Sequence, residues 1–234
     1  MNYLTSLLKE LVANRNLIWE LSKADFRKRF VGSYFGVVWM FIQPIVTVLI
    51  YWLIFDPIGF KSAPPVPNAS YVQWLIPGIA PWFFFSEALN CGTGCLQEYN
   101  YLVKKVVFNI SVLPVVKIIS AMFVHAFFVL FTIILYAAYG NFPDFYYLQI
   151  IYYSGCVFLL VLGLSYATSA IVIFFRDLTQ IINIVLQVGV WLTPIMWDVN
   201  MLSNYPWLIK LFKLNPMYYI VTGYRDSMLG HVWF

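Results

Sequence analysis

Charged side chains are scarce in this 234-residue chain: Asp, Glu, Lys and Arg make up 10% of it, whereas an ordinary globular protein has about 25%. Hydrophobic residues make up 62%, and 9 Trp, 17 Tyr and 21 Phe give an aromatic share of 20%. This composition excludes a soluble enzyme and a disulfide-stapled secreted module. The net charge of +4 is too small to favour nucleic acid as a partner. We therefore predict an all-α, polytopic bundle of transmembrane helices in a lipid bilayer.

Residues that bind metals are equally few. The three cysteines are an odd number, and Cys91 and Cys95 lie in apolar sequence, where small packing residues are more common than metal ligands. The two histidines, His125 and His231, are far apart, and His125 lies in a long apolar run. A packing role for His125 is favoured over a role in proton or substrate handling. We expect no metal site.

Nucleotide-binding and catalytic motifs are also missing. The sequence has no G-x-x-x-x-G-K-[ST] loop that could cradle nucleotide phosphates. No two acidic residues lie closer than five positions, which excludes the paired acids that hold Mg²⁺ in glycosyl and phosphoryl transferases. We expect no catalytic residue. A chain that crosses the membrane repeatedly without one is most often a transporter or a channel.

Five charge-poor stretches are long enough to span a bilayer, which takes about 20 apolar residues in a helix. They cover residues 30–55, 70–96, 111–139, 145–175 and 178–197. Lys and Arg near the span ends are more frequent on the side of the N-terminus, where nine lie, than on the other side, where four lie. Because basic residues favour the cytoplasmic side, the N-terminus is predicted to be cytoplasmic.

Residues 1–30 are predicted to form a cytoplasmic amphipathic interface helix, and residues 31–234 the transmembrane domain. Two apolar stripes of helical period flank a break at residues 14–16, and a basic run at residues 27–29 closes the segment. The stripes consist of Leu4, Leu7, Leu8, Leu11 and Val12, and then of Leu17, Leu21 and Ala24. Such a segment lies in the headgroup layer, either as a topology anchor alone or also as a contact for a cytoplasmic partner.

Two ionisable residues lie inside predicted spans, Glu87 in the second and Lys117 in the third. Ionisable groups at membrane depth are functional candidates. At a rise of 1.5 Å per residue, Glu87 lies ~13 Å and Lys117 ~9 Å from the cytoplasmic ends of their spans, so antiparallel spans bring them to similar depth. We predict an intramembrane Glu87–Lys117 charge pair, with a structural role favoured over a contact with substrate.

Short apolar pieces alternate with proline and lysine between Asp198 and Asp226, and none of them reaches spanning length. We predict two short helices at the outer face, either re-entrant or interfacial, because irregular backbone is tolerated at membrane depth only under protein or beside water. A plain interfacial loop is the alternative.

Six motifs carry a resemblance to a known family. The first is DFRKRFVGSYFGVVW, from Asp25 to Trp39, with Gln43-Pro44 behind it. The others are Pro77-Gly-Ile-Ala-Pro-Trp-Phe-Phe-Phe-Ser, Leu113-Pro-Val-Val-Lys, Phe175-Arg-Asp-Leu, Trp191-Leu-Thr-Pro-Ile and Asn215-Pro-Met-Tyr. In order and spacing they resemble the ABC-2 type permeases that export O-antigen, capsule and teichoic acid polymers, and the likeness covers almost the whole chain.

The resemblance implies a permease subunit of the bacterial cytoplasmic (inner) membrane that moves a lipid-linked polysaccharide outward. It implies a homodimer joined to two copies of a separate ABC ATPase subunit, which binds ATP and Mg²⁺, so no cofactor is expected in this chain. Residues 97–109, with Glu98, Lys104 and Lys105, match the coupling helix that docks into the ATPase, and Arg176-Asp177 matches a second cytoplasmic elbow.

The resemblance also implies an outer gate and a channel. The gate helices would lie within residues 200–222, with Pro206, Trp207, Pro216 and Tyr218 as candidates. Aromatic rings can contact the faces of sugar rings without holding any one of them tightly. The candidates for such channel contacts are Tyr34, Trp39, Trp82, Phe83, Phe84 and Phe85.

The family usually has six spans, whereas this sequence shows five and ends at Phe234, near the expected start of a sixth. We expect the sixth span to be missing from the sequence rather than from the protein. Two other functions remain open, an ABC-2 permease for a drug or small lipid and an ion-coupled flippase of lipid-linked glycans. The flippase would need several buried ionisable groups, of which Glu87 is the main candidate.

Overall fold

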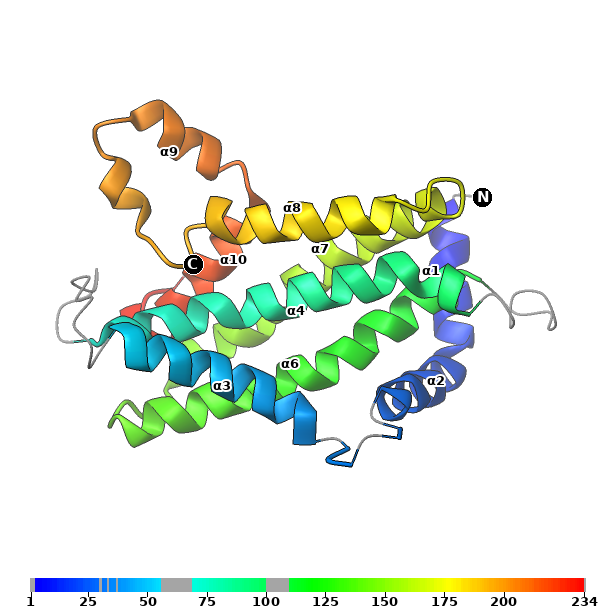
Figure 1. The fold of residues 1–234 in the computed structure, drawn as a ribbon, viewed down its shortest axis with the longest axis horizontal. Coiled ribbons are helices and arrows are strands. Elements are labelled where there is room, and N and C mark those ends of the chain that lie inside the picture. Colours follow the sequence, from blue (N-terminus) through cyan, green and yellow to red (C-terminus); the bar gives the residue numbers. More distant parts are fainter. Residues whose placement is uncertain are drawn as a thin grey trace.

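The computed structural model describes residues 3–29, 31–32, 34–36, 38–55, 69–99 and 110–233. Five long helices run side by side along the long axis of the molecule (Figure 1). They are α3 (Val38–Phe55), α4 (Tyr71–Glu98), α6 (Val112–Ala138), α7 (Leu148–Val172) and α8 (Leu178–Leu192). Each helix overlaps one predicted span, and α4 extends two residues beyond the predicted end. No strand occurs among the described residues. The predicted all-α helical bundle is confirmed.

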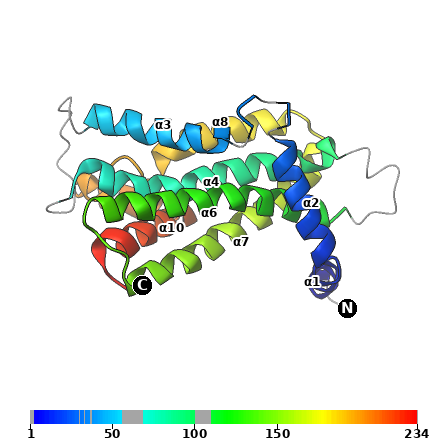
Figure 2. The ribbon, with the colours of Figure 1, turned by 90° about the horizontal axis from the view of Figure 1, so that it is seen from below.

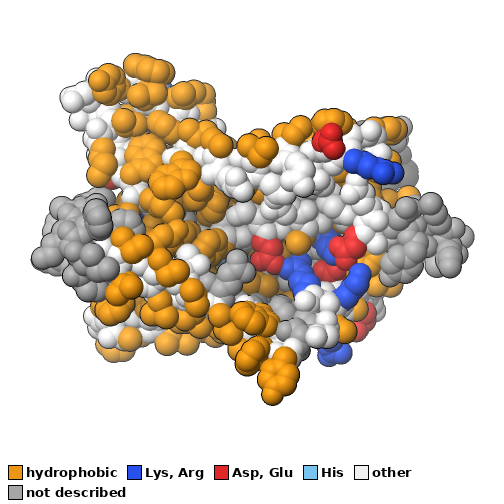
Figure 3. Space-filling model, in the orientation of Figure 1, with side chains coloured by type: hydrophobic (Ala, Val, Ile, Leu, Met, Phe, Trp, Pro, Cys, Tyr) orange, Lys and Arg blue, Asp and Glu red, His pale blue; other side chains and the backbone are white. Residues whose placement is uncertain are grey.

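Two segments are long and apolar enough to cross a membrane by length and composition alone, Val112–Ala138 and Phe145–Val172. The second combines α7 with the short 3-10 turn η1 (Phe145–Tyr147). Shorter apolar helical segments occur in α3 and α8, over Pro44–Ile54 and Leu178–Leu192. Many large hydrophobic side chains of the bundle are exposed, and in Figure 3 they gather on the part of the face that lies away from α1 and α2.

The helix α3 begins at Val38, later than the predicted start of the first span near residue 30. Gly32 and Gly36 have φ angles of +84° and +52°, in the left-handed region that glycine adopts without the steric cost of a Cβ. These two glycines turn the chain between α2 and α3. The predicted span was too long here because its apolar composition continues through this turn.

The helix α4 is the central element and packs against α6, α7 and α10. A capping box starts it: the Ser70 hydroxyl accepts from the Gln73 N–H (3.2 Å), and Gln73 Oε1 accepts from the Ser70 N–H (2.7 Å). The helix continues through Pro77 and Pro81 without ending. Its residues from Tyr71 to Trp82 are all buried, so neighbouring elements enclose the part that the prolines weaken.

The N-terminal segment forms two helices, α1 (Tyr3–Ala13) and α2 (Arg15–Lys28), which break at Asn14 as predicted. They cross one end of the bundle at a steep angle to the long helices (Figure 2). The buried residues of α2 are Ile18, Ser22 and Asp25, whereas Leu17 and Ala24 of the predicted stripe are exposed and Leu21 is half-buried. Ile18 packs against the first turn of α6, which rotates this face inward.

The two short helices predicted near the C-terminus are present and occupy different places. The helix α9 (Pro206–Phe212) projects from the bundle beyond the end of α8 (Figure 1), whereas α10 (Pro216–Arg225) packs against α4 and α7. A 3-10 turn, η2 (Val199–Leu202), precedes α9, and a π-helical turn, η3 (Asp226–Gly230), follows α10. Only α10 is thus enclosed by the other helices.

Candidate functional site

Charged side chains of three helices meet at the α2 end of the bundle, where Figure 3 shows red and blue atoms close together. Lys117 of α6 is the central cation: its Nζ lies 2.6 Å from Asp25 Oδ1 and 2.6 Å from Glu98 Oε2. Lys28 Nζ lies 3.1 Å from the other oxygen of Glu98. The side chains of Asp25 and Lys117 are only 1% and 5% exposed, so water screens this pair weakly. We call these residues, together with Arg29 and Glu87, the charge cluster.

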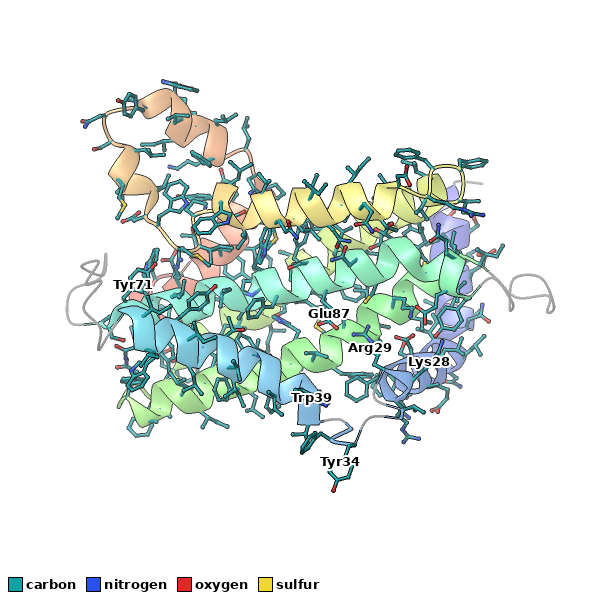
Figure 4. The ribbon with its side chains drawn as sticks, viewed as in Figure 1. Lys28, Arg29, Tyr34, Trp39, Tyr71 and Glu87 are labelled. Carbon is teal, nitrogen blue, oxygen red and sulfur yellow. The ribbon has the colours of Figure 1, made fainter. Side chains whose placement is uncertain are left out.

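Arg29 extends the charge cluster from α2 to the middle of α4. Its guanidinium forms an ion pair with Glu87, and Figure 4 shows the two side chains pointing toward each other. Its Nε lies 3.6 Å from Asp25 Oδ2, so Asp25 lies between the two cations Arg29 and Lys117. The cluster therefore runs without interruption from Glu87 through Arg29, Asp25 and Lys117 to the end of α4.

Asp25 also receives a hydrogen bond from a neutral group, the Tyr99 hydroxyl, at 2.8 Å. The ammonium groups of Lys117 and Lys28 lie 5.0 and 5.4 Å from the centre of the Tyr99 ring, within the range of cation–π attraction. Burial by itself would raise the pKa of the Asp25 carboxyl. The hydrogen bond and charge of Lys117, with the hydrogen bond from Tyr99, outweigh burial and hold the pKa of Asp25 below its ordinary value. Asp25 is therefore ionised at neutral pH.

The predicted direct pair of Glu87 and Lys117 is wrong in this structure. Glu87 pairs with Arg29, and Lys117 pairs with Asp25 and Glu98. Glu87 and Lys117 lie at similar depth in neighbouring helices, but α2 brings two further charged residues, Asp25 and Arg29, between them. Glu87 and Lys117 belong to the same cluster but are linked through Arg29 and Asp25.

A cavity of about 500 Å³ adjoins the charge cluster and lies between α3, α4 and α6. Its wall is mostly apolar and aromatic, with a few polar and charged side chains. The lining residues are Arg29, Trp39, Pro44, Ala80, Phe83, Phe84, Ser86, Glu87, Asn90, Val124, His125 and Phe128. A volume of this size is typical of a small-ligand site.

Three of the six aromatic channel candidates, Trp39, Phe83 and Phe84, line this cavity. The other three do not. Tyr34 is 97% exposed and projects away from the bundle (Figure 4). Trp82 is buried against α8, where a Cβ on Gly189 would come within 2.9 Å of its ring, and Phe85 is buried beside it with 5.5 Å between the ring centroids.

The predicted coupling residues fall into three groups. Glu98 lies in the charge cluster, where it accepts from Lys28 and Lys117. Arg176 and Asp177 are exposed in the turn between α7 and α8, at the same end of the bundle as α1 (Figure 1). Lys104 and Lys105 lie outside the described residues.

The predicted outer-gate residues lie on the two short helices. Pro206 and Trp207 are exposed on α9, and Trp207 is 65% exposed. Pro216 begins α10, where the Asn215 side chain accepts from the Met217 N–H at 3.0 Å. Tyr218 lines a second cavity of about 240 Å³ between Trp74, η2, α9 and the end of α10.

Beside this second cavity, Arg225 joins α10 to two other elements. Its guanidinium donates to the backbone carbonyls of Trp74 (3.2 Å), Pro194 (2.8 Å) and Ile195. The guanidinium carbon lies 3.6 Å from the centre of the Trp74 ring. These carbonyls lie in the first turns of α4 and just after α8, so one side chain holds three segments together. Arg225 thus supplies donors to two backbone carbonyls of the segment that follows α8.

Sequence reasoning missed three residues of these sites. Asp25 has a sequence signal, because it continues the i, i+4, i+7 series of Ile18 and Ser22 that forms the buried face of α2. Arg29 closes the basic run, and nothing in its position tells it apart from Lys28. Arg225 lies between short apolar pieces, where an exposed cation is the usual expectation.

Comparison with known proteins identifies the family. The family profile described as ABC-2 type transporter matches residues 16–229. The chain is 26% identical over 228 residues to the O-antigen export system permease protein RfbA of Myxococcus xanthus, covering 96% of this chain and 85% of that protein. It is 26% identical over 225 residues to RfbA of Klebsiella pneumoniae, and the match covers 93% of this chain and 82% of that protein. It is 22% identical over 209 residues to the polysialic acid transport protein KpsM of Escherichia coli, covering 88% and 78%. The chain therefore belongs to the ABC-2 type transporter family, and the resemblance carried by its motifs is confirmed.

Proposed function

We propose that this chain is the transmembrane permease subunit of an ATP-driven exporter that moves a lipid-linked polysaccharide across the bacterial inner membrane. The observation that carries the proposal is the match over nearly the full chain to permeases of O-antigen export and polysialic acid transport. The sequence agrees with it, because a permease that lacks a nucleotide-binding loop needs ATP hydrolysis on another chain. That chain is an ABC ATPase subunit.

We further propose an assembly of two permease and two ATPase subunits, with the α2 end of the bundle facing the cytoplasm. In support of this orientation, α1 and α2, the end of α4, the start of α6 and the α7–α8 turn lie at the same end of the bundle (Figure 1). Basic residues are most frequent in these segments, as expected at a cytoplasmic face.

Coupling to the ATPase follows from the position of the charge cluster. The cluster fastens α2 to the end of α4 and to the start of α6. In the sequence, residues 100–109 connect these two helices. A push from the ATPase on residues 100–109 would therefore move α2, α4 and α6 as one body. Reversal of Lys104 and Lys105 to glutamate is expected to abolish substrate-stimulated ATP hydrolysis. Unchanged assembly and unchanged stimulation in that variant would contradict a coupling role for this segment.

The function is tested by purification of the tagged chain in mild detergent, with mass spectrometry of the proteins that come with it. We expect a stoichiometric partner that carries a nucleotide-binding loop. Deletion of the gene that encodes this chain should also stop the display of one glycan on the cell surface, while the lipid-linked polymer accumulates inside the cell. A homo-oligomer without an ATPase in lipid nanodiscs would contradict the proposal and favour an ion-coupled flippase.

A further inference from the structure

We propose that the cavity between α3, α4 and α6 binds one neutral sugar ring of the exported glycan. The inference rests on the proposed function and adds a defined substrate site within a single subunit. It is carried by the aromatic walls of the cavity, by an amide on its wall that makes no hydrogen bond to any described residue, and by the balance of charge at its edge.

The apolar part of the cavity offers flat surfaces to the C–H face of a sugar. Trp39 of α3 and Phe83 of α4 line it, and the Phe83 ring meets the edge of Phe128 of α6 at 5.6 Å between centroids. Such rings provide a large contact area with little loss of conformational freedom on binding. Ligand sites are typically built from walls of this kind with a few polar groups.

The cavity wall is held rigid by a buried hydrogen-bond network. Phe84 packs on the His125 ring, with 4.8 Å between the centroids. His125 Nε2 lies 2.9 Å from the Tyr224 hydroxyl, which lies 2.6 Å from the Ser154 hydroxyl. His125 and Tyr224 are almost completely buried, so α4, α6, α7 and α10 together fix the position of this wall. A rigid wall lowers the entropic cost of ordering a bound ligand.

One face of α4 changes from apolar to polar along the cavity. Ala80, Phe83, Glu87 and Asn90 follow one another at helical spacing, and Asn90 lies about 10 Å along the helix from Phe83. Within the described part of the chain, the Asn90 side-chain amide makes no hydrogen bond, and Glu87 is bonded to Arg29 through Oε1. An amide supplies both donors and an acceptor, as adjacent hydroxyl groups of a sugar require.

The charges at the edge of the cavity favour a neutral ligand over a phosphate group. The charge cluster contains three carboxylates and three cations, so its formal net charge is zero. A phosphate group would meet Glu87 as well as Arg29 and would gain little net attraction. Hydroxyl groups can donate to the carboxylate and accept from the guanidinium. A sugar ring therefore suits this edge better than a lipid phosphate.

The site is tested by photocrosslinking in cells that export the glycan. Phe83 is replaced by benzoylphenylalanine in the full chain, and Leu159, which is 67% exposed on α7, is replaced in the same way as a control. Mass spectrometry of the irradiated protein then identifies what has been attached. We expect a carbohydrate adduct at position 83 and only lipid adducts at position 159. Lipid adducts alone, or no adduct, at position 83 in cells that still export would overturn the inference.

A second variant separates this inference from the proposed function. Asn90→Leu in the Phe83-labelled chain is expected to lower the yield of the carbohydrate adduct about tenfold, as the loss of hydrogen bonds to a ligand predicts. Asn141→Leu, in the loop after α6, serves as the matched control and should leave the yield unchanged. If the adduct is insensitive to Asn90→Leu while an ATPase still co-purifies, only the sugar site is wrong. If no ATPase co-purifies, the proposed function itself is wrong.

Discussion

Asp25 accepts hydrogen bonds from Lys117 and Tyr99 and lies 3.6 Å from Arg29, so a single carboxylate connects α2 with α4 and α6. Removal of its charge leaves two nearby cations undercompensated in a buried place. Breaking a buried ion pair from one side costs about 3–5 kcal/mol. We predict that Asp25→Asn lowers the Tm of the detergent-purified protein by roughly 6–20 °C in a thermal denaturation measurement.

The control for Asp25→Asn lies on the same helix. Glu20 forms a 3.0 Å ion pair with Lys23, and the two side chains are 70% and 40% exposed. An exposed pair of this kind contributes about 0–1 kcal/mol, so Glu20→Gln should change the Tm little. Equal effects of the two substitutions would contradict the role assigned to Asp25.

The same carboxyl predicts how stability depends on pH. Because the pKa of Asp25 is lower in the folded protein than its ordinary value of 3.8, ionisation of Asp25 stabilises the fold above that pH. This contribution is lost as the pH falls from about 4 toward the lowered pKa. In thermal denaturation between about pH 7 and pH 3, the wild type should lose more stability on acidification than Asp25→Asn. Parallel curves for the two proteins would contradict this account.

Close packing between α4 and α7 depends on a glycine. A Cβ on Gly92 would lie 2.2 Å from Ser165 Oγ and 2.7 Å from Ser165 Cβ, whereas a Cβ on Gly94 would meet nothing within 4 Å. We predict that Gly92→Ala destabilises the protein by about 1–3 kcal/mol, because α4 and α7 must separate. Gly94→Ala should be neutral or slightly stabilising, since alanine favours helix more than glycine does.

A rescue experiment checks the stated cause. The atoms nearest to the added methyl group belong to the side chain of Ser165, and its backbone Cα is 3.8 Å away. Ser165→Gly should therefore restore much of the stability that Gly92→Ala removes, as measured by thermal denaturation of the double variant. If the stability losses of the two single variants add up in the double variant, the clash with Ser165 is not the cause of the destabilisation by Gly92→Ala.

At the end of the bundle opposite α1 and α2, Arg225 holds α10 against the start of α4 and the segment after α8. The planar guanidinium of Arg225 donates to the carbonyls of Trp74, Pro194 and Ile195 at once. A lysine at this position keeps the charge, but its compact ammonium group cannot reproduce this arrangement of donors. We predict that Arg225→Lys destabilises the protein by about 1–3 kcal/mol, the cost of leaving buried carbonyls unpaired. An Arg225→Lys variant that unfolds at the same Tm as the wild type would contradict the anchoring role.

Elements were more predictable from the sequence than side-chain partners. A membrane helix needs a long apolar run, so the five runs located the five long helices, and the basic and apolar spacing located α1 and α2. The start of α3 was misplaced, because two glycines turn a chain whose composition stays apolar. The burial of Ser22 and Asp25 in α2 was not predicted, because a search for apolar stripes passes over polar residues.

The candidate site depends on contacts that sequence spacing does not encode. The Glu87–Lys117 prediction used the depth of two spans and could not include a third helix that crosses them. Trp39, Phe83 and Phe84 line the cavity, whereas Trp82 and Phe85 lie in the same aromatic run and pack elsewhere. Which residues of such a run face a cavity depends on the rotation of α4 between its neighbours, which tertiary packing decides.

At the scale of the whole molecule, the bundle has many exposed hydrophobic side chains and a charge cluster that fastens α2, α4 and α6 together near the end where α1 and α2 lie (Figure 3). The exposed hydrophobic side chains of the described structure suit contact with lipid. The charge cluster ties α2 to the two helices, α4 and α6, that flank residues 100–109. With the family assignment, this arrangement fits a permease that is moved by a partner rather than by its own chemistry.

The central claim, that ATP hydrolysed by a partner drives glycan export, is tested most directly by transport into inside-out membrane vesicles. The vesicles carry this chain with its co-purifying ATPase, and the glycan protected from external glycosidase is measured. The account predicts transport that requires hydrolysable ATP and continues when a proton ionophore removes the ion gradient. Transport that proceeds without ATP and stops with the ionophore would contradict it.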